Sequence, residues 1–295
     1  MTQRITFIGF GEAATAFVDG WTDVTDIRAF DIKTDDEALR PTLLSRYQKH
    51  GVAGRLSVQE AVTDADMIFC TVTADQAPVA AQAAAPYLKP GALWFDMNSC
   101  APSSKRQAAE TIEAVGARYV DVAVMAPVYP QQNLAPLLLA GPHAAEAEPL
   151  LKALPMAPAI VEGPVGSASS IKMIRSIMMK GLEALTAECV LAAVNAGVDE
   201  AVLSSLGKTY PGIDWPRQSA YNLERTLVHG ARRAAEMREV AKTVSDLGFP
   251  SDMATATVAW QERLGAVERD RELDLEAADY RTIVADITPG LRHKD

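Results

Sequence analysis

The chain opens with residues whose types and spacing are suited to holding phosphate groups. The apolar run Ile5–Ile8 leads into Gly9-Phe10-Gly11-Glu12-Ala13-Ala14, and Asp31 follows twenty positions after Gly11. Gly9 permits a tight turn after a strand, and Gly11 lets the backbone approach a pyrophosphate at the N-terminus of the next helix. This order of strand, glycine turn, helix and acid predicts a dinucleotide site. Its expected backbone contacts come from Gly9, Phe10, Gly11, Glu12 and Ala13.

Asp31 bears on which dinucleotide the chain takes. It ends the segment Ile27–Phe30, which is expected to form the second strand. A carboxylate at this point accepts the ribose hydroxyls of NAD and repels the additional phosphate of NADP. Lys33 lies two residues further on and weakens that repulsion. The sequence therefore favours NAD, with NADP as the alternative.

Polar residues also follow two later apolar runs. Val72 and Thr73 stand at the end of one run, and Asn98 and Ser99 follow the run Leu93–Asp96. Ligands of open parallel sheets bind beyond the carboxyl ends of the strands. We therefore expect Val72, Thr73 and Asn98 to contact the cofactor, and Asn98 and Ser99 to orient a substrate hydroxyl or carboxylate. The alternative is that Asn98 and Ser99 cap the helix that begins near Pro102.

Lys172 is the candidate for moving a proton. It lies in the first turns of a predicted long helix, just after Gly163-Pro164-Val165-Gly166, and Ser176 follows it by one turn on the same face. Oxidation of an alcohol needs a group that takes the hydroxyl proton, and a lysine can do so when burial and nearby positive charge lower its pKa. Arg175 supplies such a charge. The alternative is an ordinary solvated lysine on an amphipathic helix.

The elements that would position these residues divide the chain in two. Short apolar runs alternate with helical segments up to about residue 163, which predicts an α/β Rossmann domain with a doubly wound parallel sheet. Residues 164–295 show only helical spacing and predict an all-α domain. Its first helix is expected to end near Gly197, and its apolar residues recur on one face: Ile171, Ile174, Met178, Leu182, Leu185 and Cys189. The expected strands are residues 5–8, 27–30, 67–72, 93–96, 119–124 and 137–140.

Composition excludes several classes of function. The chain has 295 residues and a formal net charge of −10, which argues against non-specific binding to nucleic acid or to an anionic membrane. The three cysteines form no C-x-x-C pair, and the four histidines show no ligand spacing, so no metal site is expected. No apolar run resembles a signal peptide or a membrane span, and we expect a cytoplasmic protein.

Taken together, these motifs resemble the β-hydroxyacid dehydrogenase superfamily, which includes 6-phosphogluconate and 3-hydroxyisobutyrate dehydrogenases. The resemblance rests on residues 9–14, on residues 96–102 and on residues 163–167 leading to Lys172. It implies that Lys172 is the catalytic acid/base and that Asn98 and Ser99 contact nicotinamide and substrate. Two features depart from the superfamily. Ser176 replaces the usual asparagine one turn after the lysine, and Met125-Ala126-Pro127 replaces the Ser-Gly-Gly substrate loop.

The C-terminal half resembles a branch of the superfamily described as phosphogluconate-dehydrogenase-like. The similar stretches are residues 221–225 and 229–237, where Arg225, His229 and Arg232 share one helical face. The resemblance implies a homodimer and suggests that this basic face grips an anionic or polyhydroxylated substrate. The alternative is a set of surface ion pairs, such as Arg232 with Glu236 at i+4.

These residues predict an NAD(P)-dependent oxidoreductase. The expected reaction is hydride transfer between nicotinamide and the carbinol carbon of a hydroxy acid, taken to be a sugar acid, with Lys172 as acid/base and Ser176 assisting. One alternative is an imine or ketone reductase on the same scaffold, which the missing Ser-Gly-Gly loop favours. Another is a protein that binds NAD without turnover, which the missing asparagine favours.

Overall fold

The computed structural model of the chain describes residues 3–21, 24, 26–268 and 274–291. It divides into two compact units, Met1–Met173 and Ile174–Asp295. The division falls inside one long helix, α7 (Ser167–Asn195). The predicted domain limit, between residues 163 and 164, lies in the loop that precedes this helix.

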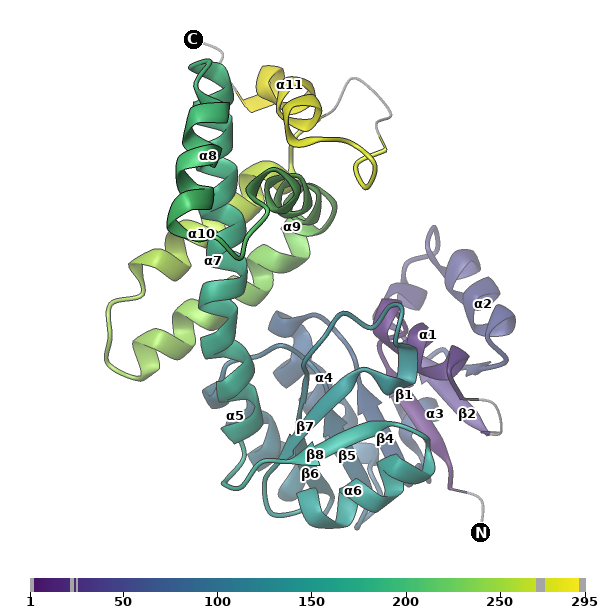
Figure 1. The fold of residues 1–295 in the computed structure, drawn as a ribbon. Helices are drawn as coiled ribbons and strands as arrows, with labels where there is room; N and C mark the ends of the chain where they lie inside the picture. Colours follow the sequence, from purple (N-terminus) through teal and green to yellow (C-terminus); the bar gives the residue numbers. More distant parts are fainter. Residues whose placement is uncertain (1–2, 22–23, 25, 269–273, 292–295) are drawn as a thin grey trace. The chain divides into compact units, whose positions relative to one another are not determined.

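The first unit is built on one mixed sheet (Figure 1). Within the described residues the sheet has eight strands in the order β3-β2-β1-β4-β5-β6-β7-β8. All neighbouring strands pair in parallel except β6 and β7, which are antiparallel. The strands are β1 (Ile5–Ile8), β2 (Ile27–Phe30), β3 (Ala53–Gly54), β4 (Met67–Cys70), β5 (Leu93–Asp96), β6 (Arg118–Val124), β7 (Pro136–Ala140) and β8 (Ala157–Ile160).

Helices cover both faces of this sheet, as its alternating side chains require. One face carries Phe7 and Phe69, which pack with α1 (Glu12–Asp19), α2 (Arg40–Lys49) and α6 (Ala144–Ala153). The other face carries Ile68 and Trp94, which pack with α3 (Val58–Val62), α4 (Ala77–Ala84) and α5 (Pro102–Glu113). Short 3-10 helices complete the unit: η1 (Ile32–Asp35), η2 (Ala74–Gln76), η3 (Ala85–Tyr87) and η4 (Gln132–Leu134).

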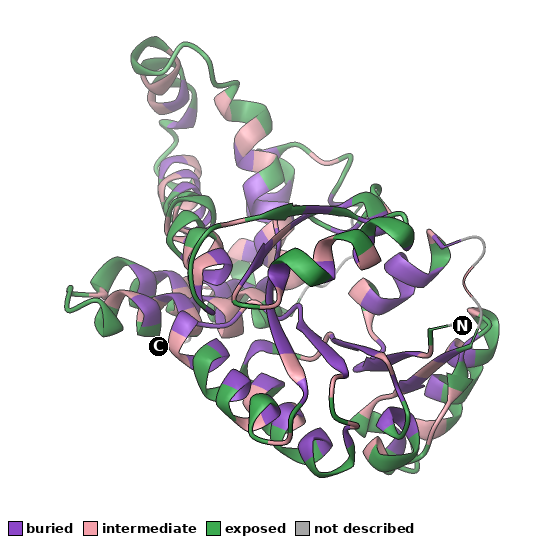
Figure 2. Ribbon diagram, turned by 90° about the horizontal axis from the view of Figure 1, so that it is seen from below, coloured by how far each residue is buried: buried purple, intermediate pink, exposed green. Residues whose placement is uncertain are grey.

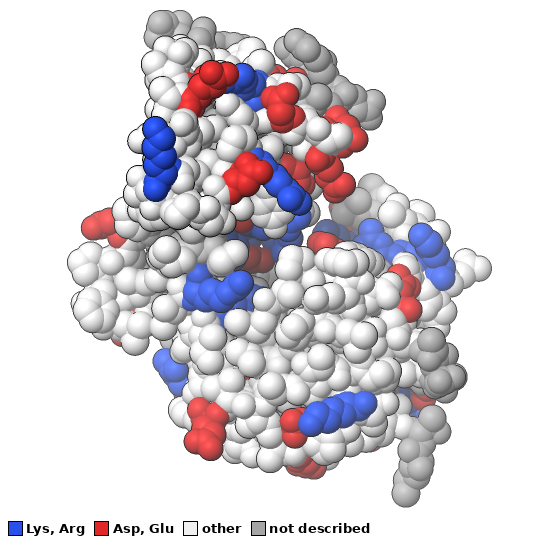
Figure 3. Space-filling model, in the orientation of Figure 1, with Lys and Arg blue, Asp and Glu red and all other residues white. Residues whose placement is uncertain are grey.

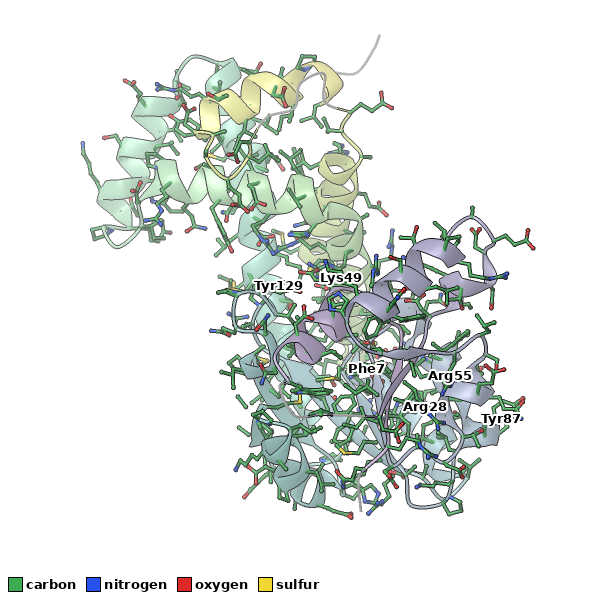
Figure 4. The ribbon with its side chains drawn as sticks, turned by 90° about the vertical axis from the view of Figure 1, so that its right-hand side faces the viewer. Phe7, Arg28, Lys49, Arg55, Tyr87 and Tyr129 are labelled. Carbon is green, nitrogen blue, oxygen red and sulfur yellow. The ribbon has the colours of Figure 1, made fainter. Side chains whose placement is uncertain are left out.

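Aromatic residues fill the core under the glycine turn. Phe7 stacks on Phe69 with ring centroids 5.2 Å apart, and Phe69 stacks on Phe95 at 4.9 Å. Figure 2 shows the central strands buried, and Figure 4 labels Phe7 in the interior of the unit. Such packing makes the strand ends rigid, and these ends carry the candidate site.

The second unit is helical. It contains the rest of α7, α8 (Asp199–Thr209), α9 (Trp215–Asp246), α10 (Asp252–Gly265) and α11 (Tyr280–Leu291). The backbones of α9 and α10 meet at two glycines, because a Cβ on Gly230 would lie 2.6 Å from the Cα of Gly265. Leu223, Leu264 and Ile283 belong to its apolar core.

The predicted fold class, a Rossmann domain followed by a helical domain, is confirmed. The sheet is parallel as predicted except between β6 and β7, which are antiparallel, and β3, α6 and β8 were not predicted. The apolar face predicted on α7 is exposed over much of its length, with Met178 63% exposed and Leu185 57% exposed. The opposite face is the buried one, and it carries Ser176, Lys180 and Glu183.

The surface of each unit mixes charges of both signs on the side that Figure 3 shows. Across the residues that the structure describes, none of the helices has both the length and the apolar character that crossing a membrane requires.

Candidate dinucleotide and active site

The glycine turn connects β1 to α1 and is held on both sides. Gly9 adopts a left-handed φ of +83°, and a Cβ there would lie 2.7 Å from the carbonyl oxygen of Thr71. The Thr71 hydroxyl donates to the Gly9 carbonyl at 2.8 Å. Gly9 is therefore required by the backbone itself, both for its φ and for the close approach of the next strand end.

Gly11 has a different role from Gly9. It is the N-cap residue of α1 with an ordinary φ of −94°, and no atom lies within 4 Å of the position a Cβ would take. The fold therefore does not demand a glycine here, and the open space lies over the first turn of a helix whose amides face outward. This is the space a pyrophosphate would use. Glu12 is exposed in that first turn.

Phe10 contributes only its backbone to this turn. Its side chain is fully buried and packs against Tyr47 with ring centroids 5.2 Å apart. Its amide donates to Asp31 Oδ2 at 2.9 Å, and its carbonyl accepts from Arg46 at 3.1 Å. The glycine turn and the acid of the second strand are therefore directly joined.

Asp31 uses both carboxylate oxygens locally. Oδ2 accepts from the Phe10 amide, and Oδ1 accepts from the Lys33 amide at 3.0 Å. Each carboxylate oxygen has a second lone pair, so the group still has capacity for two ribose hydroxyls. The neighbouring strand end contributes Val72, which is half-buried, and Thr73, which is exposed.

Asn98 lies at the end of β5 and is 4% exposed. Its Nδ2 donates to Asp96 Oδ1 at 2.7 Å and to the sulfur of Cys70 at 3.3 Å, while its Oδ1 has no hydrogen-bond partner among the residues that the structure describes. The N-cap residue of α5 is Ala101, so Asn98 does not cap that helix through its side chain. A buried acceptor without a partner indicates a place for a donor that the protein does not supply. A ribose or substrate hydroxyl fits this requirement, and the half-buried Ser99 adjoins it.

A buried ionic cluster below Asn98 was not predicted from the sequence. Lys105 is fully buried, and its Nζ donates to the Asp96 carbonyl at 2.6 Å and to Asp96 Oδ1 at 3.0 Å. It also lies 3.6 Å from Asp121 Oδ1. Burial disfavours the Lys105 charge, but the carboxylates of Asp96 and Asp121 outweigh it and raise the pKa of the ammonium above its usual value. The Tyr119 hydroxyl donates to Asp96 Oδ2 at 2.6 Å.

The start of α7 is held by Asp121. Its Oδ2 accepts from the amides of Gly166 at 3.0 Å and Ser169 at 3.1 Å, and from the Ser169 hydroxyl at 3.3 Å. Lys172 follows Ser169 by three residues, belongs to the first unit and is half-buried. Cys70 is a poor nucleophile, because burial raises the pKa of its thiol well above the usual value.

The other predicted residues belong to the second unit. Ser176 is buried and accepts from Lys180 Nζ at 3.4 Å, and Lys180 pairs with Glu236 at 2.9 Å. Arg232 is exposed and pairs with Glu236 at 3.2 Å, which is the surface pair given above as the alternative.

Arg225 and His229 differ from Arg232 in their surroundings. Both are half-buried, and Arg225 Nε is buried without a hydrogen-bond partner. Among the described residues Arg225 Nε therefore has no hydrogen-bond partner, whereas Arg232 pairs with Glu236. In the described part of the chain, no group of three or more His, Cys, Asp or Glu side chains is placed to hold a metal ion; His293 lies outside it.

Comparison with known proteins places these features in a family. Residues 28–157 match the model of the NAD binding domain of 6-phosphogluconate dehydrogenase, and residues 193–264 match a domain of unknown function, DUF1932. A conserved hypothetical protein from Sinorhizobium meliloti has a solved structure that is 36% identical, with a TM-score of 0.76, over 99% of this chain and 97% of that one.

Two further solved structures share the fold. A conserved protein of unknown function, described as structurally similar to 3-hydroxyacid dehydrogenases, is 26% identical with a TM-score of 0.67, over 88% of this chain and 96% of that one. A 3-hydroxyisobutyrate dehydrogenase from Mycobacterium tuberculosis is 19% identical with a TM-score of 0.68, over 97% and 99%. The chain therefore belongs to the same family as the Sinorhizobium meliloti protein, and it joins an NAD-binding domain of the 6-phosphogluconate dehydrogenase type to a DUF1932 domain.

Proposed function

We propose that this chain is a dehydrogenase that oxidises a hydroxy acid, of the sugar-acid class, with NAD as the cofactor and Lys172 as the acid/base. The observation that carries the proposal is the carboxyl edge of the sheet. Within one compact unit it has an open glycine cradle at Gly11, an unpartnered buried acceptor on Asn98 and the anchored turn that leads to Lys172. Bound NAD would supply a hydride acceptor for the carbinol carbon of the substrate.

Residues of the chain would bind the cofactor and orient the substrate. The first-turn amides of α1 and the open side of Gly11 would hold the pyrophosphate, and Asp31 would hold the adenosine ribose. Val72 and Thr73 would border the cofactor. Asn98 Oδ1 would accept from a hydroxyl, with Ser99 beside it.

Lys172 would take the hydroxyl proton as its ammonium forms and return it in the reverse reaction. Ser176, one helical turn further along α7, would assist at the same end of the substrate. Within the second unit, Arg225 and His229 would bind an anionic group, and Arg232 would extend this basic face.

A homodimer is part of the proposal. Ile174, Met178, Leu182 and Leu185 are 43% to 63% exposed along α7. A continuous apolar helix face of this kind is typical of a surface that another chain covers. A second copy, packed against the same face, would bury it.

The experiment is a screen of sugar acids and small hydroxy acids, with NAD and NADP in parallel, in which the absorbance of the reduced nicotinamide is followed. We expect reduction with at least one acid and a higher kcat/KM for NAD than for NADP. Turnover of no hydroxy acid would contradict the proposal, and the same assay decides the cofactor.

The second candidate is an imine or ketone reductase on the same scaffold. Residues 125–127 are Met-Ala-Pro, so the loop after β6 lacks the paired glycines expected to hold a carboxylate, and Tyr129 on this loop is 46% exposed (Figure 4). An apolar loop suits a neutral carbonyl better than a carboxylate. Reduction of neutral ketones or imines, without any oxidation of hydroxy acids, would favour this candidate.

A further inference from the structure

We propose that Lys105, Asp96 and Asp121 form one buried positioning unit, which sets the strand-end Asn98 and the first turn of α7 in register with each other. The inference rests on the proposed function, because it concerns the placement of Lys172. Every residue in it lies within Met1–Met173. None of the three is assigned a contact with cofactor or substrate.

The two carboxylates stand side by side on adjacent strands. Asp96 ends β5, and its register partner on β6 is Asp121. Both are at most 1% exposed, and two buried carboxylates repel each other strongly. Lys105, from the first turns of α5, is placed between them at 3.0 Å from Asp96 Oδ1 and 3.6 Å from Asp121 Oδ1. One buried ammonium thus holds the two strand positions together.

Each carboxylate controls a different part of the proposed site. Asp96 Oδ1 accepts from both the backbone amide and the side-chain Nδ2 of Asn98, at 3.0 and 2.7 Å. This pair of bonds fixes the amide orientation, with Nδ2 turned toward Asp96. The remaining acceptor, Asn98 Oδ1, is left for a ligand. Tyr119 holds the other oxygen of Asp96, so this carboxylate cannot rotate away.

Asp121 fixes the start of α7 in the way that Asp96 fixes Asn98. One oxygen spans the turn from Gly166 to Ser169, so the carboxylate takes up amides that the start of α7 would otherwise leave unsatisfied. A negative charge at a helix N-terminus is also favoured by the helix dipole. Gly166 allows close contact with α5, because a Cβ there would meet Arg106 and Pro102 at 2.9 and 3.0 Å. The two residues that Gly166 approaches, Arg106 and Pro102, therefore lie on the same helix as Lys105.

Directional bonds explain why this cluster is ionic and not apolar. Burying three charges is costly, and an apolar cluster of the same volume would hold the elements together equally well. Hydrogen bonds to a fixed carboxylate additionally set the rotation and height of the first helical turn. Lys172 lies one turn beyond Ser169, so its position follows from that turn. A misplacement of about 1 Å costs roughly 100-fold in rate when groups must meet in one geometry.

The test compares Asp121→Asn with Ser169→Ala and Ser170→Ala in the intact protein. Asp121→Asn keeps the shape but removes the charge toward Lys105 and one acceptor for the amides. Ser169→Ala removes the hydroxyl bond to Asp121 and also the bond of the same hydroxyl to the Gly166 carbonyl, which the Ser170 variant controls for. Ser170→Ala is the matched control, because its hydroxyl bonds to the Gly166 carbonyl within the helix and not to Asp121.

We expect Asp121→Asn to lower kcat by roughly 100-fold and to displace the acidic limb of the kcat–pH profile for oxidation, because Lys172 must be deprotonated to act as the base. The KM for the cofactor should be nearly unchanged. Ser169→Ala should lower kcat by a few-fold and displace the same limb of the kcat–pH profile in the same direction as Asp121→Asn. This variant keeps the inference testable if Asp121→Asn does not fold. Hydrogen–deuterium exchange of residues 163–175 should accelerate in both variants without any cofactor. Ser170→Ala should resemble the parent chain.

Two results would overturn the inference in distinguishable ways. If Lys172→Ala is inactive but Asp121→Asn and Ser169→Ala keep the parent kcat and pH profile, with only the melting temperature lowered, the cluster is merely structural. If Lys172→Ala itself retains full activity, the proposed function fails, and the positioning role fails with it.

Discussion

Asp31 is bound to two backbone amides and would still accept ribose hydroxyls, so its charge can be tested separately from its shape. We predict that Asp31→Asn raises the kcat/KM for NADP relative to NAD by roughly tenfold, because the repulsion of the additional phosphate is removed. Steady-state kinetics with both cofactors measures this ratio. Lys33→Ala is the control, and it should shift the ratio toward NAD. An unchanged ratio in Asp31→Asn would show that the cofactor's ribose does not lie beside this residue.

The individual residues differ in how well the sequence could identify them. Gly9, Gly11 and Asp31 were predictable because their spacing follows a known backbone requirement. Lys105 was not, since a lysine on a helix is ordinarily solvated. A signal was present, because Lys105 precedes Ala108, Ala109 and Ile112 by three, four and seven positions and thus shares their buried face. For Asn98, the sequence could not decide between a cap and a ligand contact, and only the partners of its amide exclude the cap.

At the level of elements, the two glycines of the turn between β1 and α1 have different roles: Gly9 is needed for folding, and Gly11 for binding the dinucleotide. We predict that Gly9→Ala destabilises the fold by at least about 2 kcal/mol, because a Cβ would be forced into a left-handed backbone against Thr71. Gly11→Ala should change the stability by less than about 1 kcal/mol, since its Cβ meets open space.

The same pair of variants tests whether the pyrophosphate binds beside Gly11. Gly11→Ala should nevertheless raise the Kd for NADH by about tenfold or more, because its methyl group would occupy the space of the pyrophosphate. Thermal unfolding and titration of NADH fluorescence measure the two effects. Unimpaired NADH binding in Gly11→Ala would place the dinucleotide elsewhere.

The contact between α8 and α11 predicts a dependence of stability on pH. Asp199 Oδ2 accepts from the Tyr280 hydroxyl and from Arg281 Nε, each at 2.6 Å, and these bonds lower the pKa of Asp199 below 3.8. A carboxyl with a lowered folded pKa stabilises the fold above its unfolded pKa, and this contribution disappears as the pH falls through the two values. Between about pH 5 and pH 3, the parent chain should therefore lose more stability than Asp199→Asn, as urea unfolding would show. Equal losses would mean that the carboxylate contributes nothing.

The sequence predicted the central strands because each is a short apolar run bounded by polar or glycine residues. It could not predict the direction of β7, since the alternation of strands and helices only favours a parallel arrangement. β8 was missed because its four residues include a proline and most of them are exposed, as suits an edge strand. In α6, Pro149 hides the helical pattern. On α7, spacing revealed an apolar face but could not show whether this chain or another covers it.

For the molecule as a whole, that face leads to a prediction about assembly. We expect Met178→Glu to convert a dimer into a monomer in analytical ultracentrifugation, because a charge would be placed in the centre of the apolar face. Lys208→Glu on α8 changes the charge at an exposed position of the same unit and should leave the assembly unchanged. A parent chain that sediments as a monomer at micromolar concentration would contradict the proposed homodimer.

The proposed reaction depends on a proton that leaves the substrate through Lys172. The most direct measurement is the turnover of Lys172→Ala with the best substrate of the screen, alongside its Kd for NADH. If Lys172 is the acid/base, kcat should fall by roughly two to four orders of magnitude, which is the usual range for loss of such a group. The binding of NADH should be nearly unchanged. A variant that turns over its substrate at the parent rate would contradict the proposed reaction.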